Sequence, residues 1–320
     1  MLAIEVNQLV KEYKNGVKAL NGLNLKVNRG EIFSLLGPNG AGKSSLINIL
    51  TTYYRPTRGN VTLLGQDLCK DPAWVRTQIA CVAQQISIDA HLSLLENMLF
   101  QSRLYQVDPQ AAKERIKSLI GSFQLSEYLQ YPTAFYSGGI KRRLDIAMSM
   151  VSSPKILFLD EPTVGMDVES RKAMWEMLLK IRDEYETTIF LTTHYLEEAE
   201  QLSDTICIMK DGKELIQGTP CSLRSYTGQN MLRIAFSNSG GTKKYKDALK
   251  NTGLIKFASV RDNSLFVGVD EGRTAFTAVN KWLLDQQVEF EAIEIVEPSL
   301  EDVFLVLTGS GENKGEELVC

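Results

Sequence analysis

Cysteine is scarce in this sequence, and the few that occur are scattered. There are five among 320 residues, an odd number, and no Cys-x-x-Cys pair occurs. This pattern argues against a disulfide framework and against a zinc site, and it favours a reducing compartment. The five are Cys69, Cys81, Cys207, Cys221 and Cys320.

Long hydrophobic runs are also missing. No run approaches the roughly 18 consecutive apolar residues of a membrane-spanning helix, so we expect no segment here to span a bilayer. The N-terminus lacks a basic region followed by an apolar block, and we therefore expect no secretory signal. If the protein works at a membrane, another chain must supply the membrane-spanning part.

Excess positive charge is absent as well. The formal net charge is −4, so the composition gives no indication of nucleic-acid binding. Apolar residues make up 44% and charged residues 23% of the chain, which is the balance of a globular protein with a sizeable core. The length of 320 residues suggests two domains.

One glycine-rich stretch carries the strongest signal in the sequence. It reads G-x-x-x-x-G-K-S, and a predicted strand over residues 32–36 precedes it, while a predicted helix over residues 45–50 follows it. In this context the loop N–H groups and the helix N-terminus bind phosphate. Lys43 would then reach the β- and γ-phosphates, and Ser44 would ligate Mg²⁺. The loop is Gly37-Pro38-Asn39-Gly40-Ala41-Gly42-Lys43-Ser44.

Polar residues follow three further predicted strands. Asp160 and Glu161 end an apolar strand, where Asp160 suits Mg²⁺ held through water and Glu161 could polarise an attacking water, unless both are merely a solvated acidic pair. Gln84 follows a strand over residues 79–83 and could reach the metal or that water, although glutamines are common at strand ends. His194 follows the strand 188–192, and we expect it to contact the γ-phosphate.

Two further residues, Tyr13 and Asp167, each have two possible roles. Tyr13 follows a strand over residues 3–10, and it could stack on a purine or equally well cap a sheet edge. Asp167 precedes a predicted helix over residues 168–185 and could be a site residue or only the N-cap.

Residues 93–130 break the strand–helix alternation. They read as two amphipathic helices with no strand between them, a helical insertion in an α/β pattern. Ser137-Gly138-Gly139 then opens another helix, which is a second anion-binding design. Either the chain binds two nucleotides, or one of the two phosphate-binding segments completes a site on another subunit. The basic triple 141–143 on this helix is interpreted as a solvated face.

With the glycine loop, Tyr136-Ser137-Gly138-Gly139-Ile140, Leu157-Phe158-Leu159-Asp160-Glu161 and Thr193-His194 in this order, the chain resembles an ABC-type ATPase, the nucleotide-binding subunit of ABC transporters. The resemblance covers about residues 3–220 and implies a P-loop α/β fold, ATP hydrolysis, and ATP and Mg²⁺ as cofactors. By this resemblance Tyr13 stacks on adenine, and Gly37 to Ser45 form the Walker A loop. Gln84 is the Q-loop glutamine, and Ser137 to Ile140 form the signature. Asp160 is the Walker B aspartate, Glu161 the catalytic carboxylate, Asp167 the D-loop aspartate and His194 the switch histidine. The usual Leu-Ser-Gly-Gly-Gln signature has Tyr136 and Ile140 at its ends here, with the centre intact.

The resemblance also implies partners. The signature of one subunit covers the nucleotide of another in a head-to-tail dimer, and the helical insertion and Gln84 meet a transmembrane permease subunit. The expected location is peripheral, at the cytoplasmic face of the cell membrane. The turn 165–167, the segment 192–200 and the ending 300–309 resemble a narrower group, the daunorubicin-resistance and nodulation-type ATPases of ABC-2 exporters. The alternative is a soluble ABC ATPase acting on ribosomes or nucleic acid, which the single cassette and net negative charge disfavour.

The pattern changes after residue 220. Strand 231–236, helix 243–251, strands 255–261 and 264–269, helix 273–286 and strand 288–296 give the β-α-β-β-α-β order of a ferredoxin-like motif. We therefore expect an ABC-type ATP-binding domain over 1–220 with a helical subdomain at about 86–152, a small α+β accessory domain over 221–309, and a polar tail over 310–320.

Overall fold

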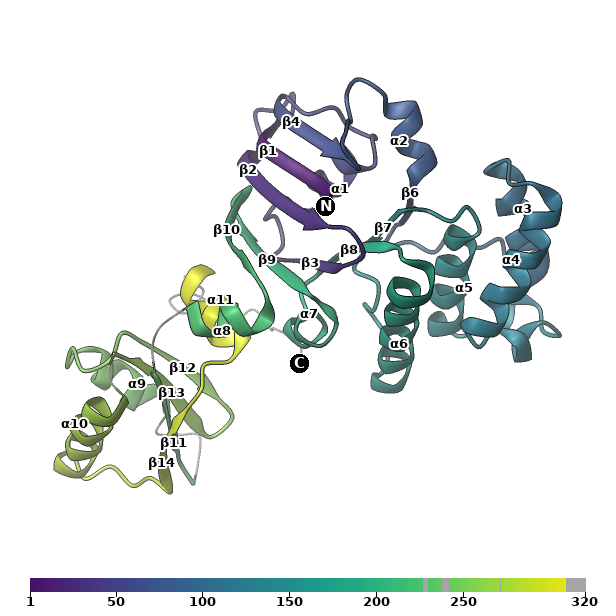
Figure 1. Ribbon diagram of the computed structural model, residues 1–320. Helices are drawn as coiled ribbons and strands as arrows, with labels where there is room; N and C mark the ends of the chain where they lie inside the picture. Colours follow the sequence, from purple (N-terminus) through teal and green to yellow (C-terminus); the bar gives the residue numbers. More distant parts are fainter. Residues whose placement is uncertain (227–229, 238–241, 271, 309–320) are drawn as a thin grey trace. The chain divides into compact units, whose positions relative to one another are not determined.

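The computed structural model describes residues 1–226, 230–237, 242–270 and 272–308 (Figure 1). The chain divides into two compact units, Met1–Gln217 and Gly218–Cys320. The predicted polar tail lies outside the described residues. Among the described residues, none of the helices combines the length and the apolar character that crossing a membrane requires.

A six-stranded sheet forms the centre of the first unit. In spatial order its strands are β10 (Lys213–Gly218), β9 (Thr205–Lys210), β3 (Ile32–Leu36), β8 (Thr188–Thr193), β7 (Ile156–Asp160) and β6 (Ile79–Val82). From β9 to β6 neighbouring strands pair in parallel, and every residue of β3 and β8 is buried. A parallel strand covered on both faces needs a continuous apolar run rather than an alternating one, which is what the sequence supplies. The carboxyl ends of β3, β6, β7 and β8 consequently share one edge.

A second, antiparallel sheet packs on one side of this centre. Its order is β2 (Lys18–Asn28), β1 (Leu2–Glu12), β4 (Arg58–Leu63) and β5 (Gln66–Asp67). Apolar residues of this sheet and of helix α1 (Lys43–Leu50) join Phe33, Phe158 and Phe190 of the parallel sheet in one buried cluster. The rings of Phe33 and Phe190 stack with centroids 5.1 Å apart. Helix α1, which follows the glycine loop, is therefore fixed between the two sheets.

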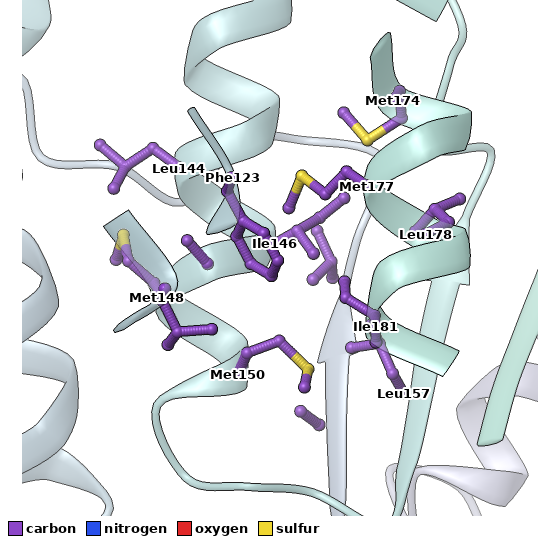
Figure 2. Close-up of a cluster of buried hydrophobic side chains, with 14 of the residues drawn as sticks. Phe123, Leu144, Ile146, Met148, Met150, Leu157, Met174, Met177, Leu178 and Ile181 are labelled. Atoms are coloured by element: carbon purple, nitrogen blue, oxygen red, sulfur yellow. The ribbon is translucent and has the colours of Figure 1, made fainter. Parts of the chain in front are cut away.

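The helical insertion packs against the other side of the parallel sheet. Its elements are α3 (Leu94–Leu104), α4 (Pro109–Ser122), two short 3-10 turns (Ser126–Tyr128 and Thr133–Phe135) and α5 (Gly138–Met150), followed by β7 and α6 (Val168–Tyr185). Figure 2 shows side chains of α5 and α6 meeting in a buried apolar cluster with Phe123 and with Leu157 of β7. This core holds α5 firmly against the sheet edge.

Side-chain caps explain where these helices begin. Ser93 forms a full capping box at the start of α3, and Asp108 caps α4 ahead of a proline at its first position. Ser137 caps α5 by accepting a hydrogen bond from the Ile140 N–H, and Asp167 caps α6 through the Ser170 N–H. Each cap lies at the boundary that the sequence predicts, to within about a residue.

The second unit contains an antiparallel sheet of order β12 (Phe257–Arg261), β13 (Ser264–Val269), β11 (Asn230–Ala235) and β14 (Ala292–Val296), with helices α9 (Thr242–Lys250) and α10 (Gly272–Asp285). Along the chain these elements follow the order β11-α9-β12-β13-α10-β14, which confirms the predicted β-α-β-β-α-β motif of this unit. Helices α8 (Pro220–Tyr226) and α11 (Leu300–Thr308) pack against one another.

Several elements differ from the prediction. Residues 66–67, predicted as part of a turn, pair with β4 as the two-residue strand β5, and β14 begins at Ala292 rather than at 288. Helices α2 (Pro72–Gln78), α7 (Leu196–Leu202), α8 and α11 are short, and of these only α7 was predicted. Tertiary packing provides most of the stability of helices this short.

Candidate active site

The glycine loop between β3 and α1 is packed tightly enough to require glycine at two positions. A Cβ on Gly37 would lie 2.4 Å from the Met209 carbonyl oxygen, and one on Gly42 would lie 2.4 Å from the Ala19 carbonyl oxygen. Gly42 also has φ of 108°, in the left-handed region where side chains are strained. Nothing lies within 4 Å of a Cβ on Gly40, so this face of the loop is open. The loop therefore has a rigid inner side and an outer side that a ligand can approach.

Lys43 is held inside the loop. It is 7% exposed, and its Nζ donates to the carbonyl oxygens of Gly37 at 2.6 Å and Pro38 at 3.2 Å. Burial lowers the pKa of this ammonium, and the nearby Glu161 and Asp160 carboxylates oppose that shift. The loop lysine and the two acidic residues after β7 are thus close enough to interact, as the sequence predicts for one phosphate site.

Tyr13 lies beside the helix that follows the loop. Its hydroxyl is 3.0 Å from Ser45 Oγ, and its ring meets the Tyr54 ring edge-on with centroids 5.8 Å apart. Lys11 Nζ lies 5.3 Å from the Tyr13 ring centroid and 5.1 Å from that of Tyr54. Tyr13 is partly exposed. The sequence analysis did not identify Tyr54, because no spacing pattern joins it to Tyr13.

Ser44, Asp160 and Gln84 are the predicted magnesium-binding residues. Asp160 ends β7, and one of its carboxylate oxygens accepts a 2.5 Å hydrogen bond from Thr192 Oγ1 of β8. Ser44 in the first turn of α1 and Gln84 after β6 are exposed. One carboxylate with a hydroxyl and an amide suits Mg²⁺, which keeps several waters and takes its other ligands from substrate phosphates. The described residues contain no group of three or more His, Cys, Asp and Glu side chains able to hold a metal by themselves.

Glu161 and His194 form a pair at the same sheet edge. His194 Nδ1 lies 3.2 Å from Glu161 Oε1, and the two side chains are 35% and 17% exposed. The backbone of Glu161 has φ of 46°, in the left-handed region that is unfavourable for a residue with a side chain. Its N–H donates to Thr192 at the carbonyl and hydroxyl oxygens, both at 3.1 Å. Strain sustained by surrounding bonds is typical of functional residues.

The Ser137-Gly138-Gly139 segment opens helix α5. Ser137 and Gly138 are exposed, and a Cβ on Gly138 would meet nothing within 4 Å. A Cβ on Gly139 would lie 3.1 Å from Ser170 Oγ, and that hydroxyl donates to the Asp167 carboxylate at 2.8 Å. The N–H of Ser170 donates to the same carboxylate and, as the largest influence, holds the pKa of Asp167 below its usual value. Asp167 is thus the N-cap of α6, and its role as a residue of the ATP site stays a prediction.

The interpretation of the basic triple as a solvated helix face is wrong for its middle residue. Arg142 is 4% exposed, and its guanidinium bonds to backbone carbonyls at the ends of β6 and β7. Lys141 and Arg143 are partly exposed. Thr192, which holds Asp160 and Glu161, was also not identified from the sequence. Both residues act on the backbone or on a neighbour across the sheet, and such contacts leave no local pattern.

Together these elements place a phosphate-binding loop, a buried lysine, an acidic strand end and a carboxylate–histidine pair at one sheet edge. This arrangement is that of a phosphate-loop nucleoside triphosphatase, in which a water attacks the terminal phosphoryl group.

Comparisons with known proteins identify the family. The ABC transporter family profile matches residues 20–164. The daunorubicin/doxorubicin resistance ATP-binding protein DrrA of Streptomyces peucetius is 37% identical, covering 96% of this chain and 92% of its own length. Nod factor export ATP-binding protein I of Rhizobium sp. (strain N33) is 33% identical, covering 96% and 97%.

Solved structures agree. The cbiO1 protein of Clostridium perfringens, part of the ABC transporter complex cbiONQ, matches with a TM-score of 0.66 at 25% identity over 79% of this chain and 97% of that one. A dimeric ATP-binding cassette bound to ADP and Pi matches with a TM-score of 0.59 at 25% identity over 68% and 98%. The chain belongs to the ABC transporter family of ATP-binding proteins, and it binds and hydrolyses ATP.

Proposed function

We propose that this chain is the ATPase subunit of an ABC-type exporter and works peripherally at the cytoplasmic face of a membrane. A separate transmembrane permease subunit would carry the transported molecule, and a second ATPase subunit would pair with this one head to tail. The similarity to drug-resistance and Nod factor export ATP-binding proteins over nearly the full chain supports export. The observation that carries the catalytic part is the contact between Glu161 and His194 beside the phosphate loop.

The residues divide the work of hydrolysis. Glu161 positions and polarises the attacking water, and His194 orients that carboxylate through the 3.2 Å contact. Lys43 leaves its loop carbonyls for the β- and γ-phosphates, where its charge stabilises the transition state. A bound Mg²⁺, held by Ser44, Asp160 and Gln84, would neutralise charge that develops on the phosphate oxygens. Tyr13 holds the adenine by stacking.

A second subunit would complete the site. Ser137 and Gly138 are exposed at the N-terminus of α5, where N–H groups and the helix dipole attract an anion. We propose that they contact the γ-phosphate of nucleotide held by the other subunit, with Asp167 next to them at the interface. The dimeric cassette among the structural relatives supports this arrangement.

The catalytic proposal is tested by changing Glu161→Gln. The amide keeps the size of the side chain but cannot act as a base, so turnover should fall on the order of a thousandfold while ATP binding persists. The variant should accumulate as an ATP-bound dimer. Light scattering measures the dimer, and release of radiolabelled phosphate measures turnover. Glu176→Gln, an exposed glutamate further along α6, is the matched control and should keep normal turnover. Near-normal hydrolysis by Glu161→Gln would reject the assigned role.

The partner proposal needs a different experiment. The tagged full chain is purified from detergent-solubilised membranes, and its companions are identified by mass spectrometry. A multi-span membrane protein should co-purify in a fixed ratio. Recovery of ribosomal proteins or nucleic acid in its place would contradict the exporter assignment while leaving the ATPase chemistry intact.

A further inference from the structure

Helix α5 carries one buried arginine between two partly exposed basic residues. Arg142 is 4% exposed, although it lies only four residues after the exposed Gly138. An ionised side chain withdrawn from water is tolerated only when other groups satisfy its charge and its hydrogen bonds. The groups that satisfy Arg142 belong to the ATP site.

The guanidinium bonds to three backbone carbonyls. Nη1 donates to Ala83, Nη2 donates to Asp160 at 3.0 Å, and Nε donates to Pro162 at 3.3 Å. Ala83 immediately precedes Gln84, while Asp160 and Pro162 stand on either side of Glu161. One side chain of α5 therefore joins the main chain at Gln84 to the main chain at Glu161.

A buried carboxylate reinforces this link. Asp145, one turn further along α5, is 4% exposed, and its Oδ2 lies 3.7 Å from Arg142 Nη1. Its Oδ1 accepts a 2.5 Å hydrogen bond from Ser87 Oγ, in the segment that contains Gln84. Burial lowers the pKa of Arg142 and raises that of Asp145, and each charge opposes the shift of the other.

We propose that Arg142 is a positioning residue that links the Ser137-Gly138-Gly139 helix to the backbone of the Gln84 segment and of the Glu161 turn. The proposal rests on the proposed function, in which the start of α5 contacts the nucleotide of the other subunit. Engagement of α5 by that nucleotide then sets the place of the water-positioning carboxylate in the chain's own site. The two ATP sites of the dimer are thereby coupled through Arg142.

The chemistry of arginine suits this role. Its planar guanidinium presents five donors in a fixed fork, so three carbonyls are held at once with defined directions. A lysine keeps the charge but has a single nitrogen on a flexible stem, and it cannot hold all three carbonyls in the same geometry. Arg142→Lys thus separates the charge of the side chain from its shape.

The test compares Arg142→Lys with Arg115→Lys in the full chain. Arg115 is a matched control because its Nη1 also donates to a backbone carbonyl of this helical insertion, that of Val151 at 3.0 Å, away from the ATP site. Mg²⁺-ATP hydrolysis gives kcat, KM and the Hill coefficient. A fluorescent ATP analogue without Mg²⁺ gives the dissociation constant, and thermal melting gives the Tm.

We expect Arg142→Lys to lower kcat by about tenfold to a hundredfold, because a small misplacement of the water-positioning group is enough for such a loss. Its Hill coefficient should fall towards 1 from a wild-type value between 1 and 2, since two sites are coupled. Nucleotide affinity should stay within about threefold. The Tm should fall further than that of Arg115→Lys, because buried carbonyls lose hydrogen-bond donors. Arg115→Lys should keep wild-type kinetics.

Two results would overturn the proposal. One is a kcat and Hill coefficient of Arg142→Lys equal to those of the control. The other is a loss of kcat that only follows a loss of Tm and of nucleotide affinity, which is what a structural role predicts. No Mg²⁺-dependent hydrolysis by the unmodified chain would instead reject the proposed function, and this inference with it.

A second variant keeps the test decisive if Arg142→Lys does not fold. Arg142→Met/Asp145→Leu removes both charges together, and replacing a buried pair with apolar groups is often tolerated. This variant should bind ATP with near wild-type affinity yet hydrolyse it slowly and without cooperativity. Cooperative hydrolysis at the wild-type rate would contradict a positioning role for Arg142.

Discussion

The two units of the chain treat buried charge differently. In the first unit, Lys43, Arg142 and Glu198 are each less than 10% exposed, and all contact the loops that leave the carboxyl edge of the parallel sheet. In the second unit, Asp302 is the buried ionisable residue of the described part, and hydrogen bonds reach both of its carboxylate oxygens. Parallel strands end side by side and leave backbone groups that side chains must satisfy, whereas hairpins pair those groups directly.

Residues other than glycine with positive φ occur in both units. Glu161 has φ of 46° directly after a buried strand, and this conformation directs its carboxylate to His194. Asp262 has φ of 49°, but it lies in the tight turn between β12 and β13, where a left-handed residue matches the twist of a hairpin. The same dihedral angle thus serves a candidate catalytic group in one unit and chain reversal in the other.

A lysine in each unit gives the largest contrast. Lys43→Ala removes the charge that we assign to the phosphates, and we expect ATP hydrolysis to fall by at least about a hundredfold. Lys256→Ala removes a surface ion pair with Asp270 in the second unit and should change stability by less than about 1 kcal/mol, with hydrolysis unaffected. Phosphate release and thermal melting of the two variants make the comparison. Undiminished hydrolysis by Lys43→Ala would contradict the role that we assign to the charge of Lys43.

Two glycines allow a second comparison. In Gly37→Ala the new methyl group meets the backbone oxygen of Met209 at 2.4 Å, so the phosphate loop must shift and ATP affinity should fall about tenfold or more. In Gly268→Ala it meets the ring of Phe257 at 2.1 Å, and the second unit should lose about 1–3 kcal/mol of stability without loss of ATP binding. Equilibrium nucleotide binding and urea unfolding measure both effects. An ATP affinity of Gly37→Ala equal to that of the unmodified chain would show that the loop does not need glycine at residue 37.

A buried glutamate in the first unit predicts a pH effect. Burial raises the pKa of Glu198, against hydrogen bonds from Thr193, Thr163 and Trp175. The pKa of Glu198 is therefore higher in the folded protein than in the unfolded one. The stability that comes from its protonated side chain is fully present below the unfolded pKa, and it is lost as the pH rises through the folded pKa. We expect Glu198→Gln to reduce the loss of stability as the pH rises above about 4.5, measured by urea unfolding at several pH values.

The buried carboxylate of the second unit has hydrogen-bond donors on both of its oxygens. Asp302 accepts hydrogen bonds from Arg261 Nη2 and from the Ser299 N–H and hydroxyl, so every oxygen is used. Asp302→Asn should therefore destabilise the second unit at neutral pH by about 1–3 kcal/mol. A stabilising effect of this substitution, or an unchanged pH slope for Glu198→Gln, would show that the two units do not differ in how they satisfy buried charge.

Much of the site was predictable because its residues are encoded next to one another. The run 37–44 is contiguous, and Asp160 and Glu161 follow directly on a strand. Tyr54 and Thr192 could not be identified in this way. Their roles depend on a ring contact with Tyr13 and on a hydrogen bond to Asp160 across the sheet.

The sequence by itself determined the parallel-sheet core, the glycine loop, the acidic strand end and the β-α-β-β-α-β order within the second unit, because apolar periodicity, caps and turn residues act over a few positions. Only the tertiary structure decided that Arg142 is buried, that Glu161 is strained against Thr192, and that His194 lies within contact of it. These facts arise where separate strands end at a common edge, and the energy of desolvating a charge depends on all the segments that enclose it.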